Sequence, residues 1–254
     1  MNINNKSRLA VLATSMSAAF LLSACQSANE KVETPVIKGG ATVEATQAAS
    51  PVADIHAGHD MSAMTANAIP ADGTSMTPML KDYTESMTKM HKEMMAGINH
   101  NNPDVAFAQG MLSHHIGAVD MAKIELKYGT DEEMRQLAQE IIDAQQSEIK
   151  QMTAWLADHP DDAEPTANTK AMQQAYADGM NDSHDDMMTG IADPVPDMAF
   201  ARGMLPHHMG AIDMAKVQLN YGKDAKMRKL AQEIIDAQQP EIEQMQSWIT
   251  AHKG

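Results

Sequence analysis

The chain has 254 residues, a net charge of −15 and a single cysteine. This charge excludes a nucleic-acid-binding function, which requires a basic face, and one cysteine excludes both a disulfide framework and a thiolate metal site. The acidity suits a cation-binding protein, although acidic residues also serve solubility. The 24 methionines depart strongly from ordinary composition, in which leucine is the commoner residue.

Residues 1–24 have the pattern of a signal peptide and are set aside from the fold. The apolar run at 9–22 is too short to cross a bilayer as a mature helix, and the LSAC sequence at 22–25 resembles a bacterial lipobox. We therefore expect export and a lipid anchor at Cys25, on the periplasmic side of the envelope. The outer membrane is the expected destination in a Gram-negative host. An ordinary secretory signal with an unrelated cysteine is the alternative.

Residues 25–76 are rich in small and polar side chains and predict a disordered tether. The tether contains the short sequence HAGHDMSAM, which brings together His56, His59, Met61 and Met64. A tether does not need such residues, so this cluster is a candidate site for flexible metal capture.

The sequence Met-x-x-His-His occurs twice, at 111–115 and 204–208, inside a duplication with an offset of 93 residues. Residues 107–155 and 200–248 are identical at 34 of 49 positions without a gap. The duplication predicts helical repeats at 77–158 and 171–252, each the size of a small domain. Residues 159–170, with prolines and acidic residues, predict the linker between them.

Each repeat reads as three helices, which in the first copy cover about residues 78–98, 104–129 and 130–158. Gly129 predicts the end of the second helix, and Thr130 with Glu133 predicts a capping box at the start of the third. No segment alternates with the period of two that a strand requires. We therefore expect an all-α protein of two tandem antiparallel helical-bundle repeats.

The inward faces of these helices carry candidate metal ligands at helical spacing. In the first repeat the candidates are His91, Met94, Met111, His114, His115, Met121, Glu148 and Met152. The second repeat has the matching residues His184, Met187, Met204, His207, His208, Met214, Glu241 and Met245. Met87 and Met90 lie on the same face as His91. Closing three such faces around one centre predicts a polar, thioether-lined core in each repeat.

Several of these residues have a plain structural interpretation beside the functional one. Methionine at helical spacing usually fills a core, and we interpret Met79 and Met134 in that way. His115 points most directly inward, while His114 either binds the metal or orients a ligand. For Met152 and His91 the two interpretations stay open. A buried Glu148 is costly unless it is paired or ligated.

Thioether and imidazole together favour copper. Thioethers are neutral and suit Cu(I), imidazole and carboxylate also hold Cu(II), and Ag(I) should compete as a chemical relative of Cu(I). Zinc fits less well, because methionine is a weak ligand for it. A ferritin-like di-iron site needs Glu-x-x-His, and the chain contains no such sequence. No nucleophile, phosphate loop or nucleotide motif is visible, so an enzyme is expected only through redox chemistry at a metal.

The segments GMLSHHIGAVDMAK with LAQEIIDAQQSEIKQMTAWL, and GMLPHHMGAIDMAK with LAQEIIDAQQPEIEQMQSWI, resemble a known family. It is the domain of unknown function 305 family, which includes the CopM-like periplasmic copper-binding proteins. The resemblance covers about 79–156 and 172–249 and implies a ferritin-like four-helix bundle that binds copper for tolerance or trafficking. It extends to Met111, His114, His115, Met121, Gln145, Glu148 and Met152, with Met204, His207, His208, Met214, Gln238, Glu241 and Met245.

The second copy departs from the first at two prolines, where Pro206 replaces Ser113 and Pro240 replaces Ser147. Each proline removes an amide donor and should kink its helix, and we expect both to project outward. Since Pro206 precedes His207, the second site is expected to differ in geometry and affinity.

We therefore expect a lipid-anchored periplasmic protein that sequesters copper or, like a metallochaperone, passes it to a copper-handling partner. A helical interaction module with methionine-rich surfaces and a metal-dependent redox enzyme are the alternatives from other classes.

Overall fold

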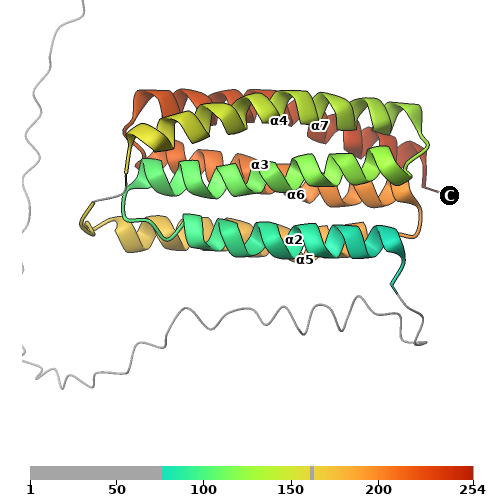
Figure 1. Cartoon of the computed structure of the whole chain (residues 1–254), viewed down its shortest axis with the longest axis horizontal. Coiled ribbons are helices and arrows are strands. Elements are labelled where there is room, and N and C mark those ends of the chain that lie inside the picture. The colour runs from blue at the N-terminus through green and yellow to red at the C-terminus, as the bar shows by residue number, and fades with distance from the viewer. Residues whose placement is uncertain (1–75, 161–162, 254) are drawn as a thin grey trace, which may run out of the picture. The chain divides into compact units, whose positions relative to one another are not determined.

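The computed structural model describes residues 76–160 and 163–253, with the backbone only at 181 and 182. Six helices and no strand occur in these residues: α2 (Pro78–Gly97), α3 (Pro103–Tyr128), α4 (Glu132–Asp158), α5 (Thr169–Ile191), α6 (Pro196–Tyr221) and α7 (Ala225–Ala251). The predicted all-α fold of two tandem antiparallel helical repeats is confirmed (Figure 1). No helix in this part of the chain has the length and apolar character to cross a membrane. The predicted signal peptide, lipidated Cys25 and histidine-containing tether cluster lie outside the described residues.

Side-chain caps define where the helices begin. Asn102 accepts the N–H of Asp104 at 3.0 Å and, followed by Pro103, starts α3. Asp131 accepts the N–H of Met134 at 3.0 Å and starts α4. The predicted cap at Thr130 is therefore wrong by one residue, because an aspartate adjacent to it occupies the cap and Thr130 hydrogen-bonds to the other repeat instead.

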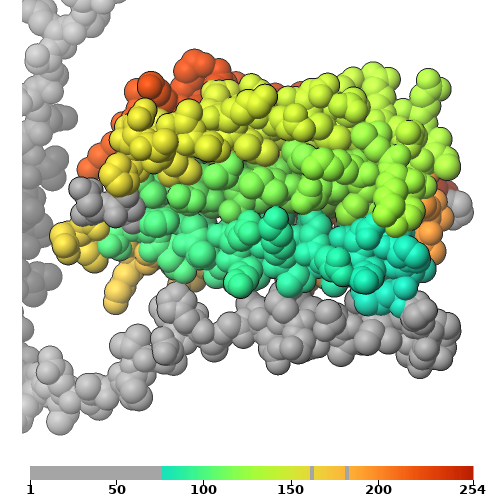
Figure 2. Space-filling view, in the orientation of Figure 1, coloured from blue at the N-terminus to red at the C-terminus, as the bar shows by residue number. Residues whose placement is uncertain are grey.

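The central pair of helices consists of α3 and α6, one from each repeat. Helix α3 packs against α2, α4 and α6, while α6 packs in the same way against α5 and α7. In Figure 1 this pair lies between α4 and α7 on one side and α2 and α5 on the other, and Figure 2 shows α3 flanked by α2 and α4. The two helices that carry the doubled histidines therefore contact each other, and the repeats form part of one compact unit.

Glycines allow this central pair to approach closely. A Cβ atom added to Gly110 would lie 3.0 Å from the Cε of Met214, and one added to Gly203 would lie 3.1 Å from the Cε of Met121. Each repeat thus inserts a methionine against the backbone of the other. A bulkier residue at either glycine would displace the facing methionine, and also Ile98 or Ile191 of its own repeat, whose Cγ2 atoms are nearer still.

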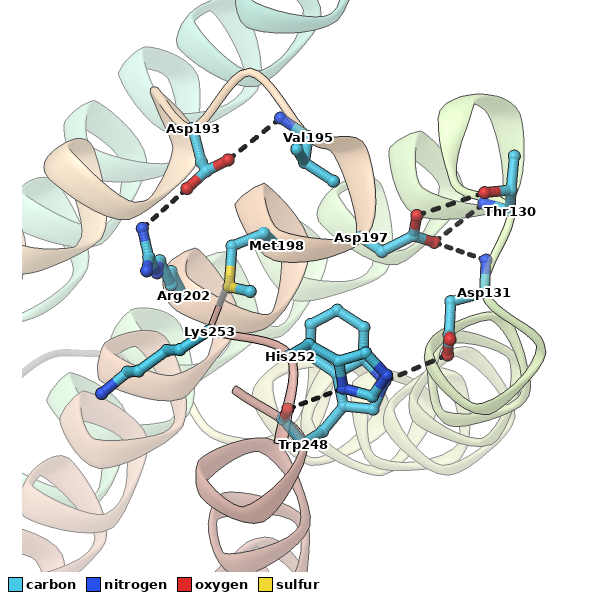
Figure 3. A pocket seen from close by; sticks show the side chains of 10 residues that line it. All are labelled: Thr130, Asp131, Asp193, Val195, Asp197, Met198, Arg202, Trp248, His252 and Lys253. Atoms are coloured by element: carbon cyan, nitrogen blue, oxygen red, sulfur yellow. Dashed lines mark hydrogen bonds and ion pairs between the residues drawn. The ribbon is translucent and has the colours of Figure 1, made fainter. Parts of the chain in front are cut away.

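Two buried aspartates join the repeats at the ends of the bundle. Asp197 accepts the N–H groups of Thr130 at 2.8 Å and of Asp131 at 2.7 Å (Figure 3). In the matching contact, Asp104 accepts the N–H groups of Lys223 and Asp224, at 2.9 and 3.0 Å. The central helix of each repeat therefore holds the start of the third helix of the other. The cavity of about 630 Å³ in Figure 3 lies beside the Asp197 contact and is lined by none of the predicted ligands.

The two prolines of the second repeat have different surroundings. Pro240 is exposed, as predicted, but the expectation that Pro206 projects outward is wrong, because Pro206 is buried. It lines a groove that residues of α5 and α7 also border. Helices α6 and α7 continue through both positions.

Candidate metal centre

A cavity of about 20 Å³ lies between the two repeats. A space of this size holds one water molecule or one ion. Four imidazoles and five thioethers line it, and we call the lining residues the interfacial cluster: Met90, His91, Met94, His114, Met180, Ser183, His184, Met187, His207, Gly210 and Met214. Helices α2, α3, α5 and α6 all contribute, so neither repeat builds this cavity alone.

Imidazoles from the two repeats meet in pairs at the interfacial cluster. The ring centroids of His114 and His207 are 3.8 Å apart, and those of His91 and His184 are 5.0 Å apart. The Nε2 atom of His207 lies 3.2 Å from the Sδ atom of Met90. The Nδ1 atoms of His114 and His207 are buried, with no hydrogen-bond partner among the described residues. Such buried, unsatisfied nitrogens are costly unless a ligand engages them.

Burial keeps these imidazoles neutral. Desolvation lowers the pKa of His207 well below its usual value, and the neighbouring His114 lowers it further. Desolvation lowers the pKa of His114 in the same way, with His115 as the next cause. At neutral pH both rings therefore keep a nitrogen lone pair, which a metal ligand requires.

A glycine makes the contact between Met90 and His207 possible. A Cβ atom added to Gly117 would lie 2.4 Å from the Sδ atom of Met90, a distance that real contacts do not reach. The matching residues of the second repeat are Ser183 and Gly210, where an added Cβ would lie 3.1 Å from the Ser183 Oγ. The centre is therefore asymmetric, with a thioether on one side and a hydroxyl on the other.

We expect Gly117→Ala to destabilise the protein by ~1–3 kcal/mol, because Met90 must move away from His207 in a tightly packed core. Gly210→Ala is the matched control and should change the unfolding free energy less, since Ser183 is small. Chemical denaturation of both variants measures the difference. Equal losses in the two variants would contradict this account of Gly117.

Two further histidines form separate pairs with glutamates. The Nε2 atom of His115 lies 2.8 Å from Glu148 Oε2, and His208 makes the matching 2.8 Å contact with Glu241. Both rings are fully buried, while the carboxylates reach solvent in part. When Nε2–H donates to the carboxylate, Nδ1 is left as a buried lone pair without a partner among the described residues.

The structure thus divides the ligands that the sequence predicts for one centre in each repeat. Seven lie together in the interfacial cluster: His91, Met94, His114, His184, Met187, His207 and Met214. Four form the His–Glu pairs, and Met111, Met152, Met204 and Met245 are fully buried in the hydrophobic core. Met121 is also fully buried, close to Gly203.

Sequence reasoning did not assign Met90, Met180 or Ser183 to a site. Met90 had a visible signal, because it shares a helical face with His91, whereas Ser183 had none. Among the described residues, no three His, Cys, Asp or Glu side chains gather as a metal-binding group. A metal site in this part of the chain would therefore need thioethers among its ligands.

These features define a helical protein with a buried imidazole and thioether centre shared between two repeats. The sequence profile of the family described as Domain of unknown function (DUF305) matches residues 104–249. The chain belongs to this family, and the resemblance seen in the sequence is confirmed.

Other proteins are similar to parts of the chain. The uncharacterized protein L153 of Acanthamoeba polyphaga mimivirus is 41% identical over 59 residues, which are 23% of this chain and only 39% of that relative. A DUF305 protein of Streptomyces coelicolor is 26% identical, with a TM-score of 0.48 over 59% of this chain and 92% of its own. The DUF305 fragment of Deinococcus radiodurans is 27% identical, with a TM-score of 0.46, and the match covers 60% of this chain and 98% of the fragment. CopM in its Cu(I)-bound form is 30% identical, with a TM-score of 0.45 over 59% and 98%, and has also been solved with silver and with Cu(II).

Proposed function

We propose that the protein binds a copper ion as Cu(I) at the interfacial cluster. The observation that carries the proposal is the cavity of about 20 Å³, which is lined by imidazoles and thioethers from both repeats. The imidazoles of His114 and His207 support it, because both rings line the cavity and neither Nδ1 atom has a hydrogen-bond partner among the described residues. Thioether and imidazole are ligands that suit Cu(I).

The charge of the cluster favours a monovalent ion. Its thioethers are neutral, burial keeps His114 and His207 neutral, and neither Glu148 nor Glu241 lines the cavity. The cost of burying an uncompensated ion rises steeply with its charge, so a neutral, buried centre disfavours divalent ions. Ag(I) should compete with Cu(I), whereas Zn²⁺ should bind weakly.

The cellular role we propose is sequestration of copper in the cell envelope, for tolerance or for transfer to a copper-handling partner. The signal peptide and the lipobox at Cys25 support an envelope location with a lipid anchor. The role is binding and ligand exchange rather than catalysis. Exposed Met and His side chains would capture the ion, and the buried cluster would hold it.

An anaerobic titration of the full chain with Cu(I), against a colorimetric Cu(I) chelator, tests the proposal. We expect one tightly bound ion per chain, because the two repeats share one centre. X-ray absorption should show nitrogen and sulfur ligands together. Two equal ions per chain, oxygen-rich coordination or failure to compete with the chelator would each contradict it.

A further inference from the structure

A groove of about 430 Å³ on the second repeat lies beside the interfacial cluster. Side chains and backbone of α5, α6 and α7 line it: Gly179, Ser183, Asp186, Thr189, Gly190, Arg202, Leu205, Pro206, Met209, Asp213 and Ile249. Ser183 is the one residue that also lines the interfacial cavity. The wall between the groove and the candidate metal centre is therefore one small side chain thick at this point.

Ser183 occupies a position that touches both solvent and the cluster. Its side chain is half-buried, so solvent reaches it from the groove. A Cβ atom added to Gly210 would lie 3.1 Å from Ser183 Oγ and 3.6 Å from His114 Nε2, which places the hydroxyl close to a candidate ligand. The hydroxyl hydrogen-bonds to the carbonyl of Gly179 or Met180, both at 3.3 Å, and so stays at the wall of its own helix.

The first repeat closes the matching position. Met90 corresponds to Ser183, is only 4% exposed, and places its sulfur 3.2 Å from His207. A flexible thioether fills the space that a hydroxyl leaves open. The two repeats thus differ at the position where an ion would pass into the centre.

We propose that Cu(I) enters and leaves the interfacial cluster through this groove, past Ser183. This inference rests on the proposed function and names the access route to the same centre. Met90 fills the matching position in the first repeat, and Ser183 is the opening.

The groove has the chemistry to receive a soft cation. Met209, 47% exposed, presents a thioether to solvent at its edge, and Asp186 adds a carboxylate. The positive charge of Arg202 is compensated by Asp193, with Nη1 and Oδ2 2.7 Å apart. His91, the other half-buried residue of the cluster, packs its ring against that of His184, with the centroids 5.0 Å apart.

The test uses Gly179→Trp in the full chain, because this position faces the groove and is not a candidate ligand. An added Cβ there meets only the Cβ of Asp213, at 3.4 Å, which is an ordinary contact, so a side chain at this position can extend into the groove. Release of Cu(I) to excess chelator and its uptake are followed by stopped flow. We expect both rates to fall at least about tenfold. The equilibrium affinity should stay unchanged, since a blocked passage slows both directions equally.

Thr88→Trp is the matched control, because Thr88 is exposed in a groove on α2 that includes no cluster residue. Its rates should equal those of the unchanged protein. Ser183→Leu, which fills the same space with an apolar side chain that cannot bind Cu(I), should also slow both uptake and release, and it provides the test if Gly179→Trp does not fold. Normal rates in Gly179→Trp or Ser183→Leu, with Cu(I) still bound, overturn the groove as the route. Absence of Cu(I) binding by the unchanged protein is a different result and overturns the proposed function as well.

Discussion

Replacing His114 and His207 together by leucine is expected to abolish high-affinity Cu(I) binding. The two rings lie 3.8 Å apart at the cavity, so both repeats would contribute a ligand to one ion there. The loss of Cu(I) affinity should exceed the roughly 10- to 100-fold loss that is typical when a residue that only orients a metal ligand is removed. Leucine is apolar and similar in size, so the core should remain filled and the helical circular dichroism spectrum should be retained. Competition titration with a Cu(I) chelator measures the change.

Replacing His115 and His208 by leucine is the matched comparison. These rings are adjacent in sequence and equally buried, but each is paired with a glutamate and neither lines the cavity. We expect lower stability, because Glu148 and Glu241 lose their partners, and a change in Cu(I) affinity of less than about tenfold. If this variant loses Cu(I) and the other retains it, each repeat holds its own ion and the shared centre is wrong.

The second large effect is expected from Glu125, which is fully buried at the end of α3. Burial, and next the neighbouring Asp197 carboxylate, raise its pKa from 4.5 to about 8. The second repeat has Gln218 in the matching place, and its amide donates to Asp104 at 2.6 Å. In the first repeat, protonated Glu125 therefore lies beside Asp197, in the place where the second repeat has the Gln218 amide beside Asp104.

The sign of the pH dependence follows from this raised pKa. Between pH 4.5 and about 8 the folded protein keeps the Glu125 proton while the unfolded chain loses it. Stability should therefore fall as pH rises through that window, by at most ~1.4 kcal/mol per pH unit, and level off above it. We expect Glu125→Gln to remove this loss and to be more stable than the unchanged protein at pH 8.5. Denaturation of both proteins at several pH values measures it.

Other groups titrate in the same range, so the difference between the two proteins is the informative quantity. The depressed pKa values of His114 and His207 act in the opposite direction, because stability is lost when pH falls below the unfolded histidine value. That contribution cancels when Glu125→Gln is compared with the unchanged protein. The reverse exchange, Gln218→Glu, should create a second alkaline loss. Parallel stability curves for Glu125→Gln and the unchanged protein would show that Glu125 is ionised in the fold.

The sequence was enough to predict the helices, the duplication and the family. Those features depend on local patterns: helical spacing, a proline at position 103 or 196, and an exact offset of 93 residues. The cap of α4 differed from prediction by one residue, because Thr130 and Asp131 are both good caps and the second repeat decides between them. Asp197 takes the N–H of Thr130, an interaction across 67 residues of sequence.

The candidate site was predicted in composition but not in arrangement. Helical periodicity shows that His114 and His115 lie near an inward face, and it favoured His115 as the residue at the centre. The structure turns His115 toward Glu148 and directs His114 to the other repeat. Neighbouring residues on a helix point in directions 100° apart, so His114 and His115 contact different helices. Periodicity alone does not show which neighbouring helix lies in which direction.

By itself, then, the sequence determined which side chains are available to a metal: imidazoles and thioethers, repeated twice and without a thiol site. Tertiary structure decided which of them meet. Helices α3 and α6 contact each other, and one cavity takes side chains from both repeats. The same packing places Ser183, the counterpart of Met90 in the second repeat, between that cavity and solvent. Contact between helices is a property of the packed chain, since it depends on volumes and close approaches that no single stretch of sequence contains.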